Sequence, residues 1–277
     1  MLATTMSLVV FLVWVKTPSL ALNKTVALND LERSLRAAKN GDTLFLAAGD
    51  YKLTHLINVQ KSISLVGMGA TKTRVISSLN QEVMRFVNVS LSLKGIGFVH
   101  LGKQKADVLN IVDSKIKIDG CSFSGAFSSD SPAKVGDGIW VHGRSSGKIS
   151  NSQFMDNSLR GLEITDNSNL ELDHVQMNHN KSGLSLYKKD KVRVVGSVFQ
   201  FNSYSGITFA NTSSGSVMNN TIESDNYGIE ILDSSTVSVS NNKISSQKEA
   251  IYVAKKAHAT IGENTFESNG SDVVYEK

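Results

Sequence analysis

Six short segments in the second half of this chain are near copies of one another. Each begins with glycine or alanine and continues with apolar residues at alternate positions: Gly138–Val141, Gly161–Ile164, Gly183–Leu186, Gly206–Phe209, Gly228–Ile231 and Ala250–Val253. Their first residues follow one another at steps of 23, 22, 23, 22 and 22 residues. A constant period in this range is typical of a solenoid. The sequence therefore predicts stacked coils of about 22 residues.

Each repeat contains three short apolar alternations separated by Ser, Asn, Asp and Gly. An alternation with period two predicts strands, and the residues between favour turns. Strands this short can pair in parallel with their counterparts one coil away, about 4.8 Å apart. The inward side chains are then expected to form three columns: Ile139, Leu162, Leu184, Ile207, Ile229 and Ile251; Phe154, Met177, Phe199, Ile222, Ile244 and Phe266; Ile149, Leu172, Val194, Val217, Val239 and Ile261.

A polar column accompanies the apolar ones. Its members recur in one turn of every coil: Asn157, Asn180, Asn202, Asp225, Gln247 and Asn269. Stacked amides can hydrogen-bond along the coils and tolerate a left-handed backbone. We therefore expect a structural role for this column rather than a catalytic one.

The strand pattern extends upstream with looser spacing. The pairs Leu44/Leu46, Ile63/Leu65, Leu91/Leu93 and Ile116/Ile118 look like one strand position, and counting that position from Leu46 to Ile261 gives ten coils. The chain here resembles the pectin-lyase-like right-handed parallel β-helix superfamily, including the opening phrase at 41–51, Ile57 and 61–67. The resemblance implies an all-β, single-stranded parallel β-helix over almost the whole chain. This fold hosts lyases, hydrolases, epimerases and inert scaffolds, so function has to be argued from residues.

The N-terminus has the features of a signal peptide. The apolar run Ser7–Val15 is too short to span a bilayer, and small residues Ser19 and Ala21 follow it. We predict a signal peptide at 1–21, a β-helix domain at 22–277, and a secreted or periplasmic protein. No Lys or Arg precedes the apolar run, so an uncleaved anchor is the alternative.

The two ends of the solenoid are expected to differ. An amphipathic helix over 28–40, with Asn29 or Asp30 at its start, would cover the first coil and its unpaired strand edges. The C-terminal segment 272–276 is predicted to be one more strand without such a cap. Self-association through that coil is therefore one expected partner interaction.

Composition narrows the choice of partners. The single cysteine, Cys121, excludes an internal disulfide framework and is expected to be a buried thiol. Without Lys16, 28 basic and 25 acidic residues remain, a mild preference for anionic partners. We expect no nucleic acid partner, no membrane contact after signal cleavage, no cofactor and no metal.

The repeat is interrupted once. The coil between Phe123 and Phe154 is 31 residues long, and the surplus lies in 125–137. Insertions in a solenoid emerge as loops on one face, and that face often binds ligands. The chemically varied segment Asp137–Arg144 follows directly.

Registering the repeats predicts which side chains meet there. Trp140 and His142 should point outward, and Asp137 should stack beneath Arg160. The residues expected to share one exposed surface within two rungs, roughly 10 Å, are Trp140, His142, Arg144, Arg160, Glu163 and Tyr187. Elsewhere the same strip is chemically plain apart from Tyr252: Thr208, Ala210, Glu230, Leu232 and Ala254.

These residue types suit an acidic sugar. Aromatic faces can stack on pyranose rings, and arginine can pair with a uronate carboxylate. A His or Tyr could then remove or return the C5 proton. The catalytic candidates are His142, Arg144 and Tyr187, and the substrate-binding candidates are Asp137, Trp140, Arg160 and Glu163.

Trp140–Ser145 is similar to a mannuronan C5-epimerase motif of the form Asp-Pro-His-Asp-Arg-Ser. His142, Arg144 and Ser145 match it, whereas both acidic positions and the proline are missing. The aspartate clusters of calcium-binding pectate lyases and the paired aspartates of polygalacturonases are also missing from the sequence.

The leading prediction is therefore an exported β-helix that binds an extended, anionic polysaccharide on its outer sheet, with or without turnover. The first alternative is a polysaccharide lyase or C5-epimerase acting on a uronate polymer. The second is a structural, assembly or copper-site maturation protein, because His174 and His179 flank Met177 in a repeat of this kind.

Overall fold

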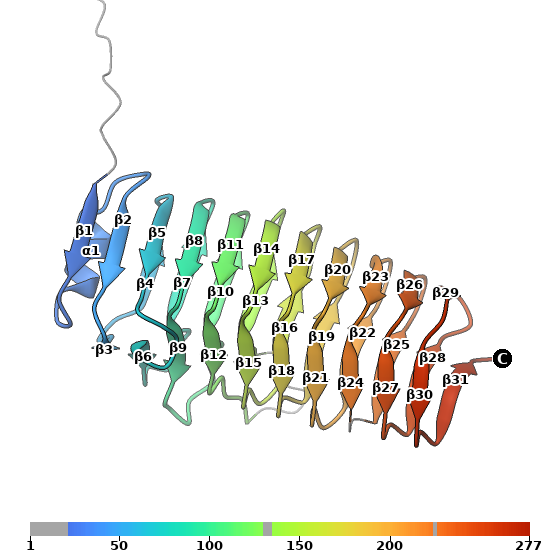
Figure 1. Cartoon of the computed structure of the whole chain (residues 1–277). Coiled ribbons are helices and arrows are strands. Elements are labelled where there is room, and N and C mark those ends of the chain that lie inside the picture. The colour runs from blue at the N-terminus through green and yellow to red at the C-terminus, as the bar shows by residue number, and fades with distance from the viewer. Residues whose placement is uncertain (1–21, 130–134, 224–225) are drawn as a thin grey trace, which may run out of the picture.

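The computed structural model describes residues 22–129, 135–223 and 226–277, so the predicted signal peptide lies outside the described residues. The described residues form a parallel β-helix of about eleven turns, built from three parallel sheets (Figure 1). Strands that neighbour one another in a sheet come from successive coils, as predicted.

Sheet A contains, in spatial order, β1 (Asn23–Val26), β2 (Thr43–Leu46), β5 (Ile63–Val66), β8 (Ser90–Lys94), β11 (Lys115–Asp119), β14 (Ser146–Ser150), β17 (Asn169–Asp173), β20 (Lys191–Val195), β23 (Ser214–Met218), β26 (Thr236–Ser240) and β29 (His258–Ile261). Sheet B contains β3 (Gly49–Lys52), β6 (Thr73–Ser77), β9 (Gly97–His100), β12 (Ser122–Ser124), β15 (Gln153–Met155), β18 (Gln176–Asn178), β21 (Val198–Gln200), β24 (Thr221–Glu223), β27 (Lys243–Ser245) and β30 (Thr265–Glu267). Sheet C contains β4 (Ile57–Val59), β7 (Met84–Val87), β10 (Leu109–Val112), β13 (Ile139–His142), β16 (Arg160–Ile164), β19 (Ser182–Leu186), β22 (Ser205–Phe209), β25 (Tyr227–Ile231), β28 (Glu249–Val253) and β31 (Ser271–Tyr275).

The three predicted apolar columns are confirmed by the strand register. Ile139 pairs with Leu162, and the same position continues to Ile251 on β28. The columns that begin at Phe154 and Ile149 pair in the same way, as far as Phe266 and Ile261. These side chains form one continuous core along the helix axis.

The register of the first coils differs from the prediction. Leu44, not Leu46, pairs with Leu65, and β1 adds a strand before β2. Sheet A therefore has eleven strands among the described residues, where the sequence count gave ten coils. The strand β1 has only one buried side chain, Val26, so its sequence lacks the apolar alternation that marks the others.

In several sheet C repeats, the opening glycine is required by the contact between coils. A Cβ atom added at Gly138 would lie 2.5 Å from the carbonyl oxygen of Gly161, and one at Gly183 would lie 2.6 Å from that of Gly206. Separations this short are a steric clash with backbone. Glycine at this position therefore allows the coils to approach one another at the edge of sheet C.

The predicted amide column is a buried hydrogen-bond ladder. Asn157 Nδ2 donates to Asn180 Oδ1 at 3.0 Å, and Asn180 Nδ2 donates to Asn202 Oδ1 at 3.1 Å. Gln247 joins through its backbone N–H, which donates to Asn269 Oδ1, whereas Asp225 lies outside the described residues. A second ladder, which was not predicted, runs along another corner through Asn220, Asn242 and Asn264.

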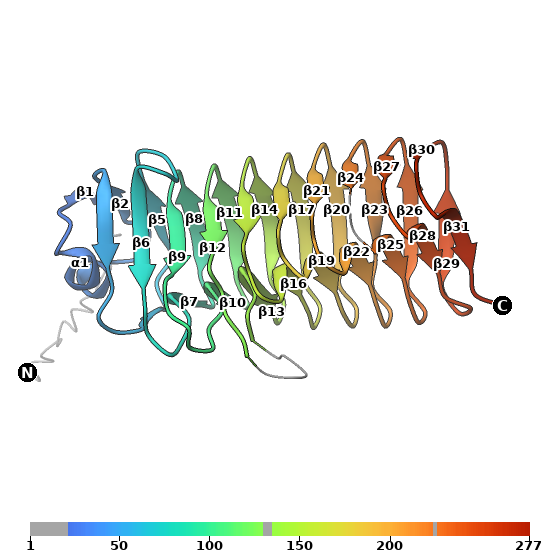
Figure 2. The same cartoon turned by 90° about the horizontal axis from the view of Figure 1, so that it is seen from below.

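The N-terminal cap is present but shorter than predicted. Helix α1 spans Leu31–Ala37 and lies at the N-terminal end of the solenoid (Figures 1 and 2). Its Leu31 and Leu35 are buried in the core. Asp30 occupies the N-cap position, but its carboxylate pairs with Arg33 instead of capping a backbone N–H. The chain becomes extended at Ala38, so the helix ends before residue 40.

The last coil is more open. Ile261, Phe266 and Val273 are only partly buried against the core, and the predicted C-terminal strand is β31.

Cys121 is a buried free thiol, as expected, and burial raises its pKa to about 12. None of the helices in the described part of the chain is long and apolar enough to cross a membrane.

The amide ladder yields a stability prediction. Replacing Asn180 with Ala removes the partner of the buried Asn157 backbone N–H and of the Phe154 carbonyl oxygen. Because buried polar groups without partners are costly, we expect the free energy of unfolding to fall by roughly 3 kcal/mol. Chemical denaturation followed by two spectroscopic probes measures the change. Asn169→Ala, on the exposed face of β17, is the control, and equal effects of the two substitutions would contradict the prediction.

Candidate functional site

The candidate site lies on the outer face of sheet C, next to the long connection between β12 and β13. The described ends of this connection leave the solenoid beside β10 and β13 (Figure 2). Phe127 and Ala106 exchange backbone hydrogen bonds of 3.0 and 2.9 Å, which fix the start of the connection to the preceding coil. The insertion predicted from the spacing is therefore confirmed in position, although 130–134 lie outside the described residues.

Arg160 is the centre of the site. Its Nη1 lies 3.3 Å from both carboxylate oxygens of Asp137 and also pairs with Glu163. Its Nη2 donates to the Tyr187 hydroxyl at 3.3 Å, and the guanidinium carbon lies 5.4 Å from the centroid of that ring. The structure thus brings together Asp137, Arg160, Glu163 and Tyr187, as the register predicted.

Two carboxyl groups of this cluster are buried, those of Asp137 and Asp107. Asp137 is 1% exposed, and beneath it Asp107 is 7% exposed and accepts the backbone N–H groups of Gly136 and Asp137 at 2.8 and 2.9 Å. Burial raises the pKa of Asp107 to about 6. Burial also raises the pKa of Asp137 well above its usual range. The positive charge of Arg160 lowers this pKa, whereas the negative charges of Glu163 and Asp107 raise it further.

Two residues of this cluster are less available to a ligand than their residue types suggest. Asp137 is buried and contacts Arg160. Arg160 is not open to a sugar carboxylate, because Asp137 and Glu163 already occupy its guanidinium. Burial by itself would lower the pKa of Arg160, but these carboxylates raise it above its ordinary value.

Trp140 and His142 form an aromatic pair on β13. Their rings stack with centroids 4.0 Å apart and planes 14° apart. His142 Nε2 lies 3.0 Å from Asn110 Oδ1, and Nδ1 lies 3.9 Å from Asp166 Oδ2. The contact with the amide oxygen is satisfied when Nε2 carries the proton, which leaves a lone pair on Nδ1. Because burial lowers the pKa of His142, the neutral ring dominates at pH 7.

Arg144 stands apart from this cluster. Its side chain is exposed, and its backbone N–H donates to Asp113 Oδ1 at 2.9 Å. Asp166 Oδ2, from the next coil, accepts the Gly143 backbone N–H at 3.2 Å.

Three residues of the site were missed in the sequence: Asp107, Asn110 and Asp166. A signal for the first two was present, because Asp107–Val112 is another copy of the Asp137–His142 segment. The 30-residue step between these copies hides the similarity, since the insertion lies between them.

A hollow of about 230 Å³ continues the site along sheet C. Arg160 and Tyr187 line one end, and Tyr204 and Glu230 line the other. The sequence prediction that Thr208 and Glu230 belong to a chemically plain strip is wrong. Glu230 is 3% exposed and accepts hydrogen bonds from Tyr204 Oη at 3.2 Å and Thr208 Oγ1 at 2.8 Å.

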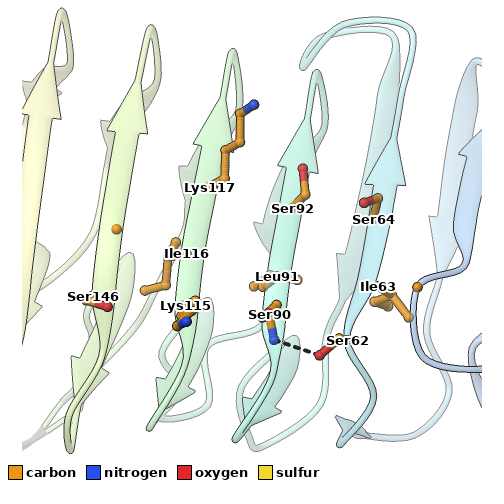
Figure 3. A pocket seen from close by; sticks show the side chains of 12 residues that line it. Ser62, Ile63, Ser64, Ser90, Leu91, Ser92, Lys115, Ile116, Lys117 and Ser146 are labelled. Atoms are coloured by element: carbon orange, nitrogen blue, oxygen red, sulfur yellow. Dashed lines mark hydrogen bonds between the residues drawn. The ribbon is translucent and has the colours of Figure 1, made fainter.

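A larger hollow of about 470 Å³ lies on the outer face of sheet A (Figure 3). Serine side chains and two lysines line it, and the Ser90 backbone N–H donates to Ser62 Oγ at 2.9 Å. Its lining contains no aromatic ring and no carboxyl group. It is therefore a trough left by small side chains, and the acid–base groups gather on sheet C instead.

The histidines considered for copper do not converge. His174 Nδ1 contacts Asp173 Oδ1 at 2.6 Å, His179 stacks on Phe201, and Met177 is buried in the core. Across the ranges that the structure describes, no group of three or more His, Cys, Asp or Glu is arranged to hold a metal ion.

Comparisons with known proteins agree on the fold. The family model described as a right handed beta helix region matches residues 108–272. The alginate lyase from Paenibacillus sp. str. FPU-7 superposes with a TM-score of 0.69 at 14% identity, covering 92% of this chain and 98% of the lyase. Dettilon tailspike protein superposes with a TM-score of 0.61 at 12% identity, covering 81% of this chain and 48% of the tailspike.

The periplasmic alginate epimerase AlgG superposes with a TM-score of 0.57 at 11% identity, covering 87% of this chain and 61% of the epimerase. The chain thus spans about half of the tailspike and three fifths of the epimerase. At these identities the likeness shows the fold alone. No curated protein matches the chain in sequence.

The buried carboxyl group of Asp107 predicts a pH dependence. Its pKa of about 6 in the folded chain exceeds the value of about 3.9 expected in the unfolded chain. The stability it contributes is therefore complete below about pH 4 and is lost as the pH rises through about 6. Asp107→Asn keeps an acceptor for the two backbone N–H groups but does not titrate.

We expect the free energy of unfolding of the wild type to fall relative to that of Asp107→Asn between about pH 4 and pH 7, by on the order of 2 to 3 kcal/mol. Urea denaturation at several pH values measures the difference, with the exposed Glu263→Gln as the control. A difference that does not change with pH would contradict the assignment.

Proposed function

This chain belongs to the right-handed β-helix family, and we propose that it binds an extended polysaccharide along the outer face of sheet C. One observation carries the proposal: an aromatic stack, a buried acid–base cluster and a hollow follow one another along a single sheet face. They involve the successive strands β13, β16, β19, β22 and β25, about 4.8 Å apart. A polymer laid across the strands would contact each in turn.

The groups along this face suit a carbohydrate. Trp140 and His142 offer flat rings for a pyranose, and the hollow offers carboxyl, hydroxyl and phenol groups for its hydroxyls. Two of the structurally similar proteins are named for alginate, one a lyase and one an epimerase. Those names agree with the proposal, and the residues of this chain carry it.

The anionic character of the polymer is part of the proposal and is assigned to Arg144. The side chain of Arg144, two residues after His142, is exposed and available to a sugar carboxylate, unlike that of Arg160. Export is also part of the proposal, since residues 1–21 have the features of a signal peptide. The protein would then meet its polymer in the periplasm or outside the cell.

A lyase or C5-epimerase is the second candidate. One observation favours this candidate: two groups that could transfer a proton lie on the same face of sheet C. The first is the neutral ring of His142, which has a lone pair on Nδ1. The second is the Tyr187 hydroxyl, which accepts a hydrogen bond from Arg160. Removal of the C5 proton of a uronate, followed by loss of the oxygen at C4, would give an unsaturated sugar. Return of the proton to the opposite face would give the epimer.

Substitution of Trp140 tests the binding proposal. Because the aromatic surface would be lost, we expect Trp140→Ala to weaken polysaccharide binding about tenfold or more. The measurement is affinity electrophoresis or calorimetry with alginate, polygalacturonate, hyaluronan and neutral mannan. Phe45→Ala removes a 40% exposed aromatic from sheet A and is the matched control. Failure of the wild type to bind any of these polymers would refute the proposal and favour an assembly role.

Substitution of Tyr187 tests the enzyme candidate. Tyr187→Phe keeps the ring against Arg160 but removes its hydroxyl group. If Tyr187 moves the proton, turnover should fall by about a hundredfold or more while binding remains within a few fold. Ultraviolet absorbance reports the unsaturated product, and proton NMR reports inversion at C5. Turnover unchanged in Tyr187→Phe would exclude this role for the hydroxyl.

A further inference from the structure

The far end of the sheet C hollow contains a polar network whose preferred sugar the proposed function leaves open. Glu230 lies on β25, with one carboxyl oxygen facing Tyr204 Oη and the other facing Thr208 Oγ1. Tyr204 is 41% exposed, and its ring packs against Tyr227 with centroids 5.5 Å apart. The carboxyl group is therefore held in place by a phenol at the rim and a hydroxyl in the floor.

The floor of the hollow continues this network towards Arg160. Thr208 Oγ1 lies 2.9 Å from Ser205 Oγ, which lies 3.0 Å from Ser182 Oγ. Ser182 lies next to Arg160 in the strand register. The hydroxyl groups thus form a buried chain from Glu230 to the Arg160 end of the hollow. Thr208 and Ser182 line the hollow and can exchange a partner for a hydroxyl of a ligand, while Ser205 connects them from below.

We propose that this hollow is a subsite for one uncharged sugar ring, in which Glu230, Tyr204 and the floor hydroxyls bind the hydroxyl groups of the ring. The inference rests on the proposed function, because it places one residue of the bound polysaccharide. It adds that the polymer presents a neutral residue here, about four coils from Arg144.

The charges around the hollow favour an uncharged ring. A sugar carboxylate would meet the Glu230 carboxyl group, with Glu249 on the next strand. Arg160 offers little compensation, because Asp137 and Glu163 already contact it. Lys181 also lines the hollow, but its side chain is exposed to solvent. Hydroxyl groups, in contrast, can both donate to the carboxylate and accept from Tyr204.

The size of the hollow agrees with a single ring. At about 230 Å³ it is smaller than the pockets of about 300 to 1,000 Å³ that enclose drug-sized ligands. Neighbouring rings of the polymer would then lie outside it, along the sheet face.

The test compares each uronate polymer of the binding panel with the same polymer after its carboxyl groups are reduced to primary alcohols. We expect Glu230→Gln to weaken binding of the reduced polymer roughly tenfold or more, because a charged acceptor is lost. Tyr204→Phe, which removes only a hydroxyl from an exposed ring, should weaken it several-fold. Glu263→Gln and Tyr275→Phe are the matched controls, and thermal melting confirms that each variant is folded.

The outcomes separate the subsite from the proposed function. Arg144→Ala should weaken binding of the acidic polymer only, whereas Glu230→Gln should weaken binding of the reduced polymer, in which every ring is uncharged. If Trp140→Ala loses binding and both Glu230→Gln and Tyr204→Phe bind the reduced polymer as the wild type does, the subsite is refuted and the function stands. If carboxyl reduction rescues Glu230→Gln, the hollow recognises a charge and the proposal is overturned. If the wild type binds no polymer, both proposals fail.

Discussion

The parallel register between successive coils is the constraint on which the rest of the structure depends. Each backbone strand can hydrogen-bond only to the coil before and the coil after it, so one misaligned coil would displace every side chain beyond it. Glycine at the start of the sheet C strands permits the close approach, and the buried asparagine ladders add side-chain bonds in the same direction. The same register orders the outer face of each sheet, where residues at equivalent positions of successive coils lie in straight columns across the strands.

The polar groups on sheet C show what such columns can do. A side chain at one position meets the same position of the next coil, so acidic and basic residues in register become neighbours without any loop to position them. Arg160 lies between Asp137 on one coil and Tyr187 on another in this way. Asp137 and Glu163 contact the Arg160 guanidinium and leave it little capacity for a ligand. Further along the same face, the Glu230 carboxyl group accepts hydrogen bonds from the hydroxyl groups of Tyr204 and Thr208.

Most of the fold could be predicted because the repeat is regular. From Ile139 to Phe266 every inward column follows from spacing alone. The prediction failed where a coil has too few apolar side chains, as in β1, or where an end effect intervenes, as at Ala38, where the chain leaves the helix early. Residues of the site could be predicted where they occupy equivalent or adjacent positions in successive repeats, because the register then makes them neighbours.

Asp137, Arg160, Glu163 and Tyr187 were found in this way, and their mutual contacts agree with it. The repeat pattern could not predict which of the outward-pointing side chains are buried. The sequence does not reveal that Asp137 is covered or that Glu230 is enclosed, since both occupy positions that point away from the apolar core. Asp107 was hidden for another reason: the insertion lengthens the step to its counterpart.

The Arg160 cluster draws its members from four successive coils: Asp107 before β10, Asp137 before β13, Arg160 and Glu163 on β16, and Tyr187 after β19. Solenoids change length by gaining or losing whole coils. A coil duplicated beyond β25 would leave every contact of this cluster intact, whereas one duplicated between β10 and β19 would separate its members by a full rung. The cluster therefore fixes the number of coils in this part of the chain, while the core itself would accept more or fewer.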